Sequence, residues 1–217
     1  VLLTAYPELE RQFNIDALEL EAFDPGALIH TERGEFQLGD PLKQPSSLTP
    51  TLRTALSQAV GSPGDFVRLL TLRYRLARTG VPTLLRGPDV ATIDALVSLG
   101  FSSTFINRFF RPLVGGIQLD LGLNTSARMF DTILKMLFSG SAAVPRHGMQ
   151  TISQQLAQQI PQHLIHLQVP VRSVSSQAVR VDSGEISASS VVIATDGNTA
   201  ADLLDQPRTT PRAAGCV

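Results

Sequence analysis

The chain has 217 residues, of which 43% are hydrophobic and 17% charged, and its formal net charge is −1. This composition is that of a globular protein, and it excludes intrinsic disorder and collagen-like structure. The apolar runs are shorter than the roughly 18 residues that a membrane-spanning helix needs, and no export signal opens the chain. The single Cys216 forms no internal disulfide, which fits a reducing compartment. We therefore expect a cytoplasmic protein, with membrane association left open.

Charge is unevenly distributed along the chain. Residues 1–47 carry nine acidic and three basic side chains, whereas residues 48–111 carry eight basic and three acidic ones. Two interpretations of the basic segment stay open: a solvated helix face, or a surface that contacts anionic lipid or a protein partner. Because exposed aromatic residues are not interleaved with the arginines and no nucleic-acid motif is present, binding to nucleic acid is not expected.

The first 47 residues predict a short helix and a hairpin. Pro7 stands at a first-turn position of the helix. Residues 27–30 and 35–38 have strand-like composition, and Arg33-Gly34 predicts the turn between them. Prolines and serines over residues 41–50 then predict a connection, with a boundary near residue 45.

From residue 48 to residue 139 the spacing of apolar residues changes to that of helices. Ser102 or Ser103 is expected to cap the fourth helix, which Pro112 and Gly115-Gly116 should end, and Ser126 to cap the fifth. On the fifth helix Asp131 and Lys135 are expected to form a surface ion pair. The residues expected to face inward are Leu52, Leu56 and Val60; Phe66, Leu69, Leu70 and Leu76; Ile93, Leu96 and Val97; and Ala127, Phe130, Leu134 and Leu137.

After a loop of small residues, the chain is expected to form one more helix, with Met149, Ile152, Leu156 and Ile160 on one face, and Pro161 ends it. Period-two patterns then predict a small antiparallel meander. Its strands are expected at residues 164–168, 171–175, 178–181 and 185–188, with the tightest turn at residues 182–184.

Residues 190–196 read Ser-Val-Val-Ile-Ala-Thr-Asp, which predicts a fully buried strand that ends at a ligand site. The usual companion of such a strand, a Gly-x-Gly-x-x-Gly turn that opens a helix, is found nowhere in the 217 residues. His163 and His166 would point to opposite faces of a strand, so no metal site is expected. No Gly-x-Ser-x-Gly elbow is present, so hydrolase chemistry is not supported.

Six segments, taken in order, resemble the flavin-containing amine oxidase superfamily, nearest its phytoene desaturase and protoporphyrinogen oxidase branch. Each motif is loose, and the order of the motifs carries the resemblance, which covers nearly the whole chain. The segments are residues 1–8, 109–117 (Phe-Phe-Arg-Pro-Leu-Val-Gly-Gly-Ile), 124–126, 145–149 (Pro-Arg-His-Gly-Met), 169–174 (Val-Pro-Val-Arg-Ser-Val) and 191–195.

The resemblance implies an FAD cofactor and a set of site residues. Val171 corresponds to the residue whose main chain contacts the adenine, and Ala194 and Thr195 to small residues beside the cofactor; an ordinary core role for Val171 stays open. Asp196 departs from the proline of related oxidases and is expected to cap the helix that follows. On the substrate side the resemblance points to Arg111, Gly115 and Gly116, in a segment suited to a large apolar substrate. Arg108 and Arg111 could hold a substrate carboxylate or form structural salt bridges.

The expected fold is α/β with α+β character: a partial FAD-binding sheet domain with a β-meander, and a mainly helical substrate subdomain. Residues 1–47 and 140–217 are assigned to the sheet portions and residues 48–139 to the helical subdomain. The expected function is oxidation of an organic, apolar substrate by hydride transfer to FAD, with no catalytic side chain identified. The resemblance also implies that the chain is an internal fragment with little activity alone.

Two other functions stay open at the sequence level. The first is a non-catalytic α/β module that binds a membrane or protein partner through its basic helices. The second is a nicotinamide-dependent dehydrogenase, which the meander before the last strand favours less than a flavoprotein. The substrate and the oligomeric state do not follow from the sequence.

Overall fold

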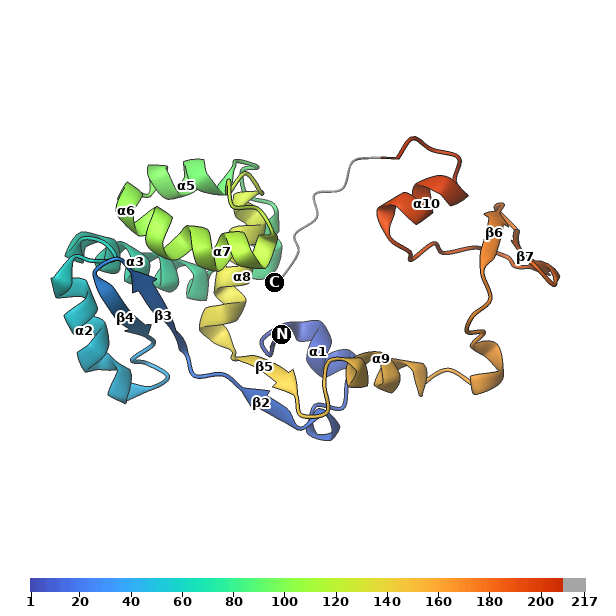
Figure 1. Ribbon diagram of the computed structural model, residues 1–217, viewed down its shortest axis with the longest axis horizontal. Coiled ribbons are helices and arrows are strands. Elements are labelled where there is room, and N and C mark those ends of the chain that lie inside the picture. The colour runs from blue at the N-terminus through green and yellow to red at the C-terminus, as the bar shows by residue number, and fades with distance from the viewer. Residues whose placement is uncertain (209–217) are drawn as a thin grey trace. The chain divides into compact units, whose positions relative to one another are not determined.

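The computed structural model describes residues 1–208. They form two compact units, one of residues 1–156 and one that begins at Ala157 (Figure 1). Helices and small antiparallel sheets occur together, which confirms the expected mixed α/β class. The functional division at residues 47 and 139 stays a prediction. No helix in the described part of the chain is both long enough and apolar enough to cross a bilayer.

The first unit contains a three-stranded sheet that the sequence did not predict. Its central strand β5 (Ala142–Pro145) pairs antiparallel with β1 (Leu2–Leu3) on one side and with β2 (Leu20–Ala22) on the other. The strands are two to four residues long, too short to establish a period-two pattern. The predicted helix at Pro7 is confirmed as α1 (Pro7–Gln12), and a 3₁₀ turn at Asp16–Leu18 leads into β2.

The predicted hairpin is confirmed as β3 (Gly26–Thr31) and β4 (Gly34–Gly39). A 3₁₀ turn (Pro45–Ser47) then leads to α2 (Leu48–Ser57), which packs along the outer edge of β4. The expected inward stripe of this helix is wrong, because Leu52 and Leu56 are 53% and 75% exposed. The helix instead turns Thr51 and Thr54 toward the strand, where their hydroxyl groups hydrogen-bond with its main chain.

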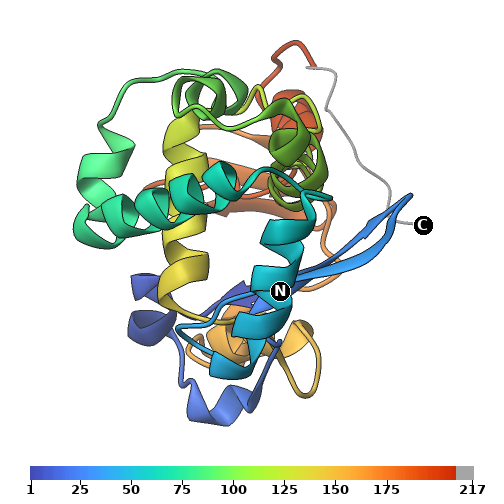
Figure 2. The same ribbon diagram turned by 90° about the vertical axis from the view of Figure 1, so that its left-hand side faces the viewer.

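Figure 2 shows the helices of the first unit from one side. They surround a core of aromatic and leucine side chains. Phe105, Phe110 and Phe130 are almost completely buried at its centre, and Ile29 and Leu38 of the hairpin close one side. Leu70 and Val97, expected to face inward, are exposed instead. The helices are α3 (Pro63–Arg78), α4 (Val81–Leu85), α5 (Thr92–Ser98), α6 (Ser103–Phe105), α7 (Arg111–Gln118) and α8 (Ala127–Ser139).

The predicted end of the fourth helix at Pro112 is wrong. The helix that Ser102 caps runs on through a π-helical turn (Ile106–Phe110) into α7. In that turn the N–H of Arg111 donates to the carbonyl of Ile106, five residues back. The wider turn lets the chain pass Pro112, which has no N–H and would crowd an ordinary α-helical turn.

Ser126 caps α8 as predicted, but the expected surface pair on that helix is wrong. The carboxylate of Asp131 accepts two hydrogen bonds from Arg75 of α3, at 2.9 and 3.0 Å. The ammonium group of Lys135 donates to the carbonyls of Leu76 and Ala77 at the end of α3. Both side chains therefore join α8 to α3, because a neighbouring helix offers them better partners than their own exposed turn does.

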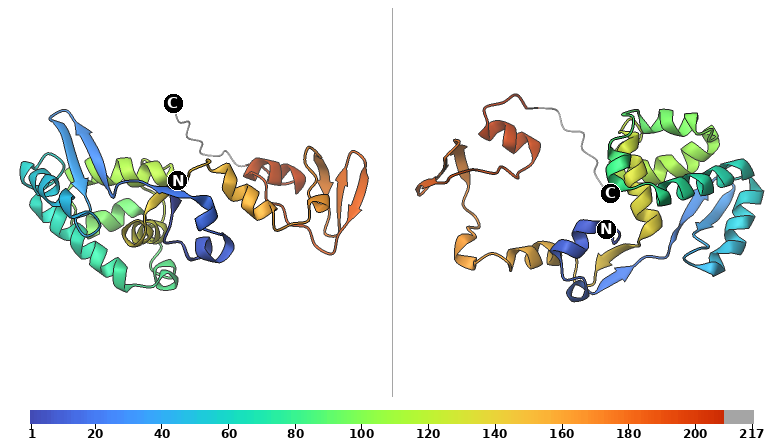
Figure 3. Two further views of the ribbon diagram at one scale, coloured as in Figure 1. Left: turned by 90° about the horizontal axis from the view of Figure 1, so that it is seen from below. Right: turned by 180° about the vertical axis from the view of Figure 1, so that it is seen from behind.

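The second unit follows α9 (Gln150–Ala157) and contains a three-stranded antiparallel meander, visible in Figure 3. The strands β6 (Val171–Val174), β7 (Ala178–Val181) and β8 (Gly184–Ser187) confirm three of the four predicted strands. The prediction of a strand at residues 164–168 is wrong, because a 3₁₀ turn (Gln162–Leu164) ends there and no strand begins before Val171. Helix α10 (Gly197–Leu203) comes last.

Candidate functional site

The expected adenine contact, Val171, lies on an edge strand. The strand order is β6-β7-β8, and Val171 is paired with Val181 of β7. Among residues 1–208 no other strand pairs with β6, so its outer side offers main-chain donors and acceptors to a ligand. The Val171 side chain is 40% exposed. The adenine contact and the ordinary core role of Val171 both stay open predictions.

The prediction of a buried strand at residues 191–195 is wrong. These residues pair with no strand in the part of the chain that the structure describes, and Val192 is 88% exposed. A fully buried strand needs a hydrogen-bonded neighbour on each side, and among residues 157–208 the antiparallel meander is the only sheet. Ala194 and Thr195 are exposed, and both remain predicted cofactor residues.

Asp196 caps α10 as expected. Its carboxylate accepts hydrogen bonds from the N–H groups of Asn198 and Thr199, both at 3.1 Å, and from the Thr199 hydroxyl at 2.6 Å. These bonds, led by that of the Thr199 hydroxyl, hold the pKa of Asp196 below its ordinary value. The carboxylate therefore occupies the anion-binding end of this helix, which is not left open for a phosphate.

On the substrate side, both arginines of the predicted segment form hydrogen bonds within the protein. Arg108 donates to the carbonyl of Ala59, and Arg111 donates to the carbonyl of Leu121 and to the side chain of Asn107. Neither arginine takes part in an ion pair found among residues 1–208, so the salt bridges considered as an alternative are not formed there. Arg111 fastens the loop of residues 119–122 over α7, and its role toward a substrate stays a prediction.

The two predicted glycines of α7 have different surroundings. A Cβ atom on Gly115 would lie 3.2 Å from the carbonyl oxygen of Asp120 and 3.3 Å from Cα of Leu121. Gly115 therefore allows the returning loop to approach the helix closely. A Cβ atom on Gly116 would meet nothing within 4 Å, so this side of α7 is open.

We expect Gly115→Ala and Gly116→Ala to change stability in opposite directions. In Gly115→Ala the backbone of residues 120 and 121 must shift, which should lower the free energy of unfolding by about 1–2 kcal/mol. In Gly116→Ala the new methyl group meets no atom, so the better helix propensity of alanine should raise it by roughly 0.5–1 kcal/mol. Urea unfolding followed by circular dichroism compares the two variants, and equal losses would contradict the assigned loop contact.

The end of α7 also carries a polar group without a partner. The amide nitrogen and oxygen of Gln118 are both buried, and neither is hydrogen-bonded within residues 1–208. Such groups are rare in folded proteins and commonly bind a water molecule or a ligand. Gln118 stands three residues after Gly115, on the same side of the helix. Nothing in its sequence context distinguishes it, because glutamine in a helix is usually solvated.

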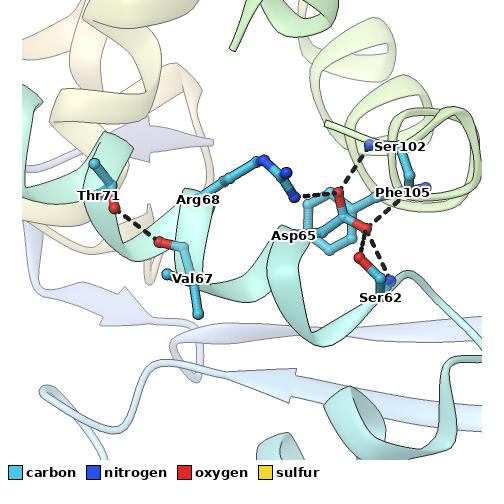
Figure 4. Close-up of polar contacts among 7 residues, drawn as sticks. All are labelled: Ser62, Asp65, Val67, Arg68, Thr71, Ser102 and Phe105. Carbon is cyan, nitrogen blue, oxygen red and sulfur yellow. Dashed lines mark hydrogen bonds and ion pairs between the residues drawn. The ribbon is translucent and has the colours of Figure 1, made fainter. Parts of the chain in front are cut away.

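A buried carboxylate holds the beginning of α3 against the beginning of α6 (Figure 4). Asp65 is completely buried and accepts hydrogen bonds from the main chain and the hydroxyl of both Ser62 and Ser102, at 2.7 to 2.8 Å. Burial alone would raise the pKa of Asp65, but these hydrogen bonds outweigh it and hold the pKa below its ordinary value. Arg68 lies 3.8 Å away. Asp65 is thus a structural anion.

Among the hollows on the first unit are two that contain none of the predicted site residues. The smaller, of about 120 Å³, is next to the buried carboxylate and is lined by Arg68, Thr71, Leu72, Arg75 and Leu99. The larger, of about 450 Å³, lies where β2 and β5 meet and is lined by Ile15, Asp16, Glu19, Leu20, Glu21 and Arg146.

The larger hollow has a mainly acidic lining. Arg146 donates to Glu21 at 2.6 and 2.9 Å and to Glu19 at 3.1 Å, and these contacts, led by the bond to Glu21, raise its pKa. The arginine belongs to the Pro-Arg-His-Gly-Met motif, but the two glutamates that bind it lie about 125 residues away in sequence. A spacing of that size gives no local signal, so this group could not be predicted.

A comparison of the chain with known families identifies its family. The family model of flavin containing amine oxidoreductases matches residues 4–215. A match of this length defines the class as flavin-dependent oxidoreductases. The chain belongs to the flavin-containing amine oxidoreductase family. No curated protein and no solved structure matches it.

The described residues fit part of a flavin dinucleotide site. The free edge of β6 offers the main-chain groups that an adenine ring needs, and small residues precede the cap of α10. The pyrophosphate is usually held where a glycine-rich turn opens a helix, and these 217 residues contain no Gly-x-Gly-x-x-Gly sequence. The predicted contacts are therefore with the adenine end of the cofactor.

Proposed function

We propose that the protein acts as an FAD-dependent oxidoreductase on an organic, mainly apolar substrate, as in the phytoene desaturase and protoporphyrinogen oxidase-like branch of its family. The family match over residues 4–215 is the observation that carries this proposal. FAD, when bound, supplies the acceptor for a hydride from the substrate. The residues of this chain bind and orient FAD and the substrate. This role agrees with the lack of an evident nucleophile or acid–base pair in the sequence.

On the cofactor side, we assign the adenine contact to the main chain of Val171 on the outer edge of β6. Ala194 and Thr195 are assigned to the neighbourhood of the dinucleotide, where small side chains leave room for it. Their exposure in the second unit supports this assignment, because neither side chain is committed to a core.

On the substrate side, we assign the contact surface to α7. Gly116 leaves the helix backbone accessible on its open side. Arg111 and Gly115 are assigned an indirect role, because they hold the loop of residues 119–122 against the helix.

The natural gene product is expected to purify with bound FAD, which acid releases and chromatography identifies. The 217 residues alone are expected to bind FAD weakly and to show little activity, since they contain no glycine-rich pyrophosphate turn. Fluorescence titration checks this second expectation, and saturable binding at micromolar concentration would contradict it.

Two outcomes would favour the other functions. A nicotinamide dinucleotide in the extract, instead of flavin, would identify a dehydrogenase. A colourless product that sediments with anionic lipid vesicles would favour a non-catalytic module. The outer side of α3 gives that alternative a specific basis, because Val67, Leu70 and Tyr74 are exposed there and Arg78 lies over the Tyr74 ring.

A further inference from the structure

Helix α3 exposes apolar side chains on the face that points away from the core. Val67, Leu70 and Tyr74 are 63%, 61% and 59% exposed, at the spacing that places them on one side of a helix. The guanidinium carbon of Arg78 lies 4.4 Å from the centre of the Tyr74 ring. A solvated helix usually carries charged residues on this side, so the exposed stripe indicates a contact surface.

The smaller hollow of the first unit adjoins this stripe. Two arginines, Arg68 and Arg75, line it, and no acidic side chain of residues 1–208 does. Thr71, which also lines the hollow, stands four residues after Val67 and three before Tyr74, so it lies next to both on the helix surface. The volume of about 120 Å³ is several times the roughly 10–15 Å³ that one water molecule needs. The hollow therefore has room for a small anion.

The guanidinium group of Arg68 has hydrogen-bond donors without an acceptor. Figure 4 shows its side chain reaching toward the carboxylate of Asp65, which is 3.8 Å away and thus beyond hydrogen-bond distance. That carboxylate already accepts four hydrogen bonds, from the main chain and the hydroxyl of Ser62 and of Ser102, and a carboxylate has about four acceptor positions. Arg68 makes no hydrogen bond within residues 1–208, and its side chain is 44% exposed.

Arg75 contributes further donors to the same hollow. Both of its hydrogen bonds to Asp131 come from Nη2, so its Nε and Nη1 donate to no acceptor in the described part of the chain. Gly100 makes room for the other arginine, since a Cβ atom there would lie 3.1 Å from Nε of Arg68. Two guanidinium groups on one small hollow repel each other. An anion between them would remove this repulsion and accept hydrogen bonds from the free donors.

We propose that this hollow binds a phosphate group, and that the group belongs to an anionic phospholipid. The planar guanidinium fork matches the oxygens of a phosphate, which can accept from both arginines at once. The adjoining stripe favours a lipid as the source, because its apolar side chains can enter the acyl-chain boundary while the arginines hold the headgroup. The only carboxylate of α3, Asp65, is completely buried, so the helix presents no charge that would repel an anionic surface.

Sedimentation of the full chain with lipid vesicles tests the proposed source. The chain is expected to bind vesicles of phosphatidylcholine that contain phosphatidic acid, but not vesicles of phosphatidylcholine alone, and salt should weaken the binding. Arg68→Gln should weaken it by at least about tenfold, since the variant loses the charge and the fork. Arg33→Gln removes the same charge at the exposed hairpin turn and should change binding by less than about twofold. Arg68→Gln breaks no hydrogen bond of residues 1–208, so circular dichroism should show an intact fold.

Inorganic phosphate separates the hollow from the apolar stripe. In the isotope-labelled chain, added phosphate should shift the Nε–H resonances of Arg68 and Arg75 saturably. Leu70→Ser should leave these shifts unchanged and weaken vesicle binding, because it alters only the stripe.

Three results would overturn the proposal. The first is vesicle binding that Arg68→Gln leaves unchanged, and the second is a lack of phosphate shifts at Arg68 and Arg75. The third is a natural gene product, with its cofactor bound, that fails to bind the same vesicles. Saturable phosphate shifts without vesicle binding would overturn the lipid source and identify a soluble phosphate compound instead. The flavin function is tested separately by the cofactor content, which none of these results changes.

Discussion

Replacing Asp65 with alanine is expected to lower the free energy of unfolding of the first unit by about 3–5 kcal/mol. The variant leaves two main-chain N–H groups and two hydroxyl groups, of Ser62 and Ser102, without their acceptor at a buried position. Each buried unsatisfied donor costs roughly 1–3 kcal/mol, and a cavity adds to the loss. Since domains are stable by only about 5–15 kcal/mol, this change should bring the unit close to unfolding.

The pH dependence of stability supplies a second measurement of the same carboxylate. Its folded pKa lies below the ordinary value of 3.8, so its contribution is fully present above that value and is lost as the pH falls through the folded pKa. Asp65→Asn should remove this acid-dependent part. The matched control is Asp94→Asn at an exposed position in the first turn of α5, which should change stability by no more than about 0.5 kcal/mol.

Urea unfolding at several pH values, followed by circular dichroism, measures both variants. Equal stability of Asp65→Asn and the natural protein near neutral pH would contradict the structural role assigned to the charge. The assignment predicts a loss there, because an amide can accept fewer hydrogen bonds than a carboxylate and brings two donors that this site does not need.

The second large effect is expected at Phe105, where substitution by alanine should cost about 3–5 kcal/mol. The ring is completely buried, and its centroid lies 5.0 to 5.6 Å from those of Phe66, Phe101, Phe109 and Phe110. Aromatic pairs at these separations add about 0.5–1.5 kcal/mol each to the energy of area burial. No single neighbour can fill the space that the ring leaves, because the ring is shared by all four.

Two further variants make this prediction specific. Phe105→Leu keeps most of the volume and should cost less than Phe105→Ala, about 1–2 kcal/mol. Phe23→Ala removes the same ring at a position that is 53% exposed and should change stability by about 0.5 kcal/mol or less. Urea unfolding compares the three variants by the midpoints of their transitions, with the slopes of the transitions expected to stay unchanged. A loss in Phe23→Ala as large as that in Phe105→Ala would show that burial in the aromatic cluster is not the cause.

Asp65 and Phe105 bear on the proposed function because both support α6, the helix that leads into α7. Asp65 holds Ser102, which caps α6, and Phe105 is the last residue of α6. The π-helical turn and α7 continue directly from there to Gly116. Loss of either anchor should therefore disturb the proposed substrate surface as well as the core, although neither residue is assigned to contact a substrate.

Local signals in the sequence determined where several elements begin and turn. Pro7, Ser126 and Asp196 each start a helix as predicted, and Arg33-Gly34 lies at the turn of the confirmed hairpin. In each case a side chain or a backbone restriction acts within a few residues, so the amino-acid order alone contains the cause. The order of the loose motifs likewise indicated the flavin-dependent family that the comparison confirms.

The tertiary structure decided which surfaces these elements bury and which partners their charged groups take. Leu52 and Leu56 have helical spacing but remain exposed, because α2 packs through its threonines. Asp131 pairs with Arg75 rather than with Lys135, since α3 lies against α8. Residues 191–195 are apolar like a buried strand but have no paired neighbour within residues 1–208. Burial and ion pairing depend on contacts between residues far apart in the chain, which local patterns do not contain.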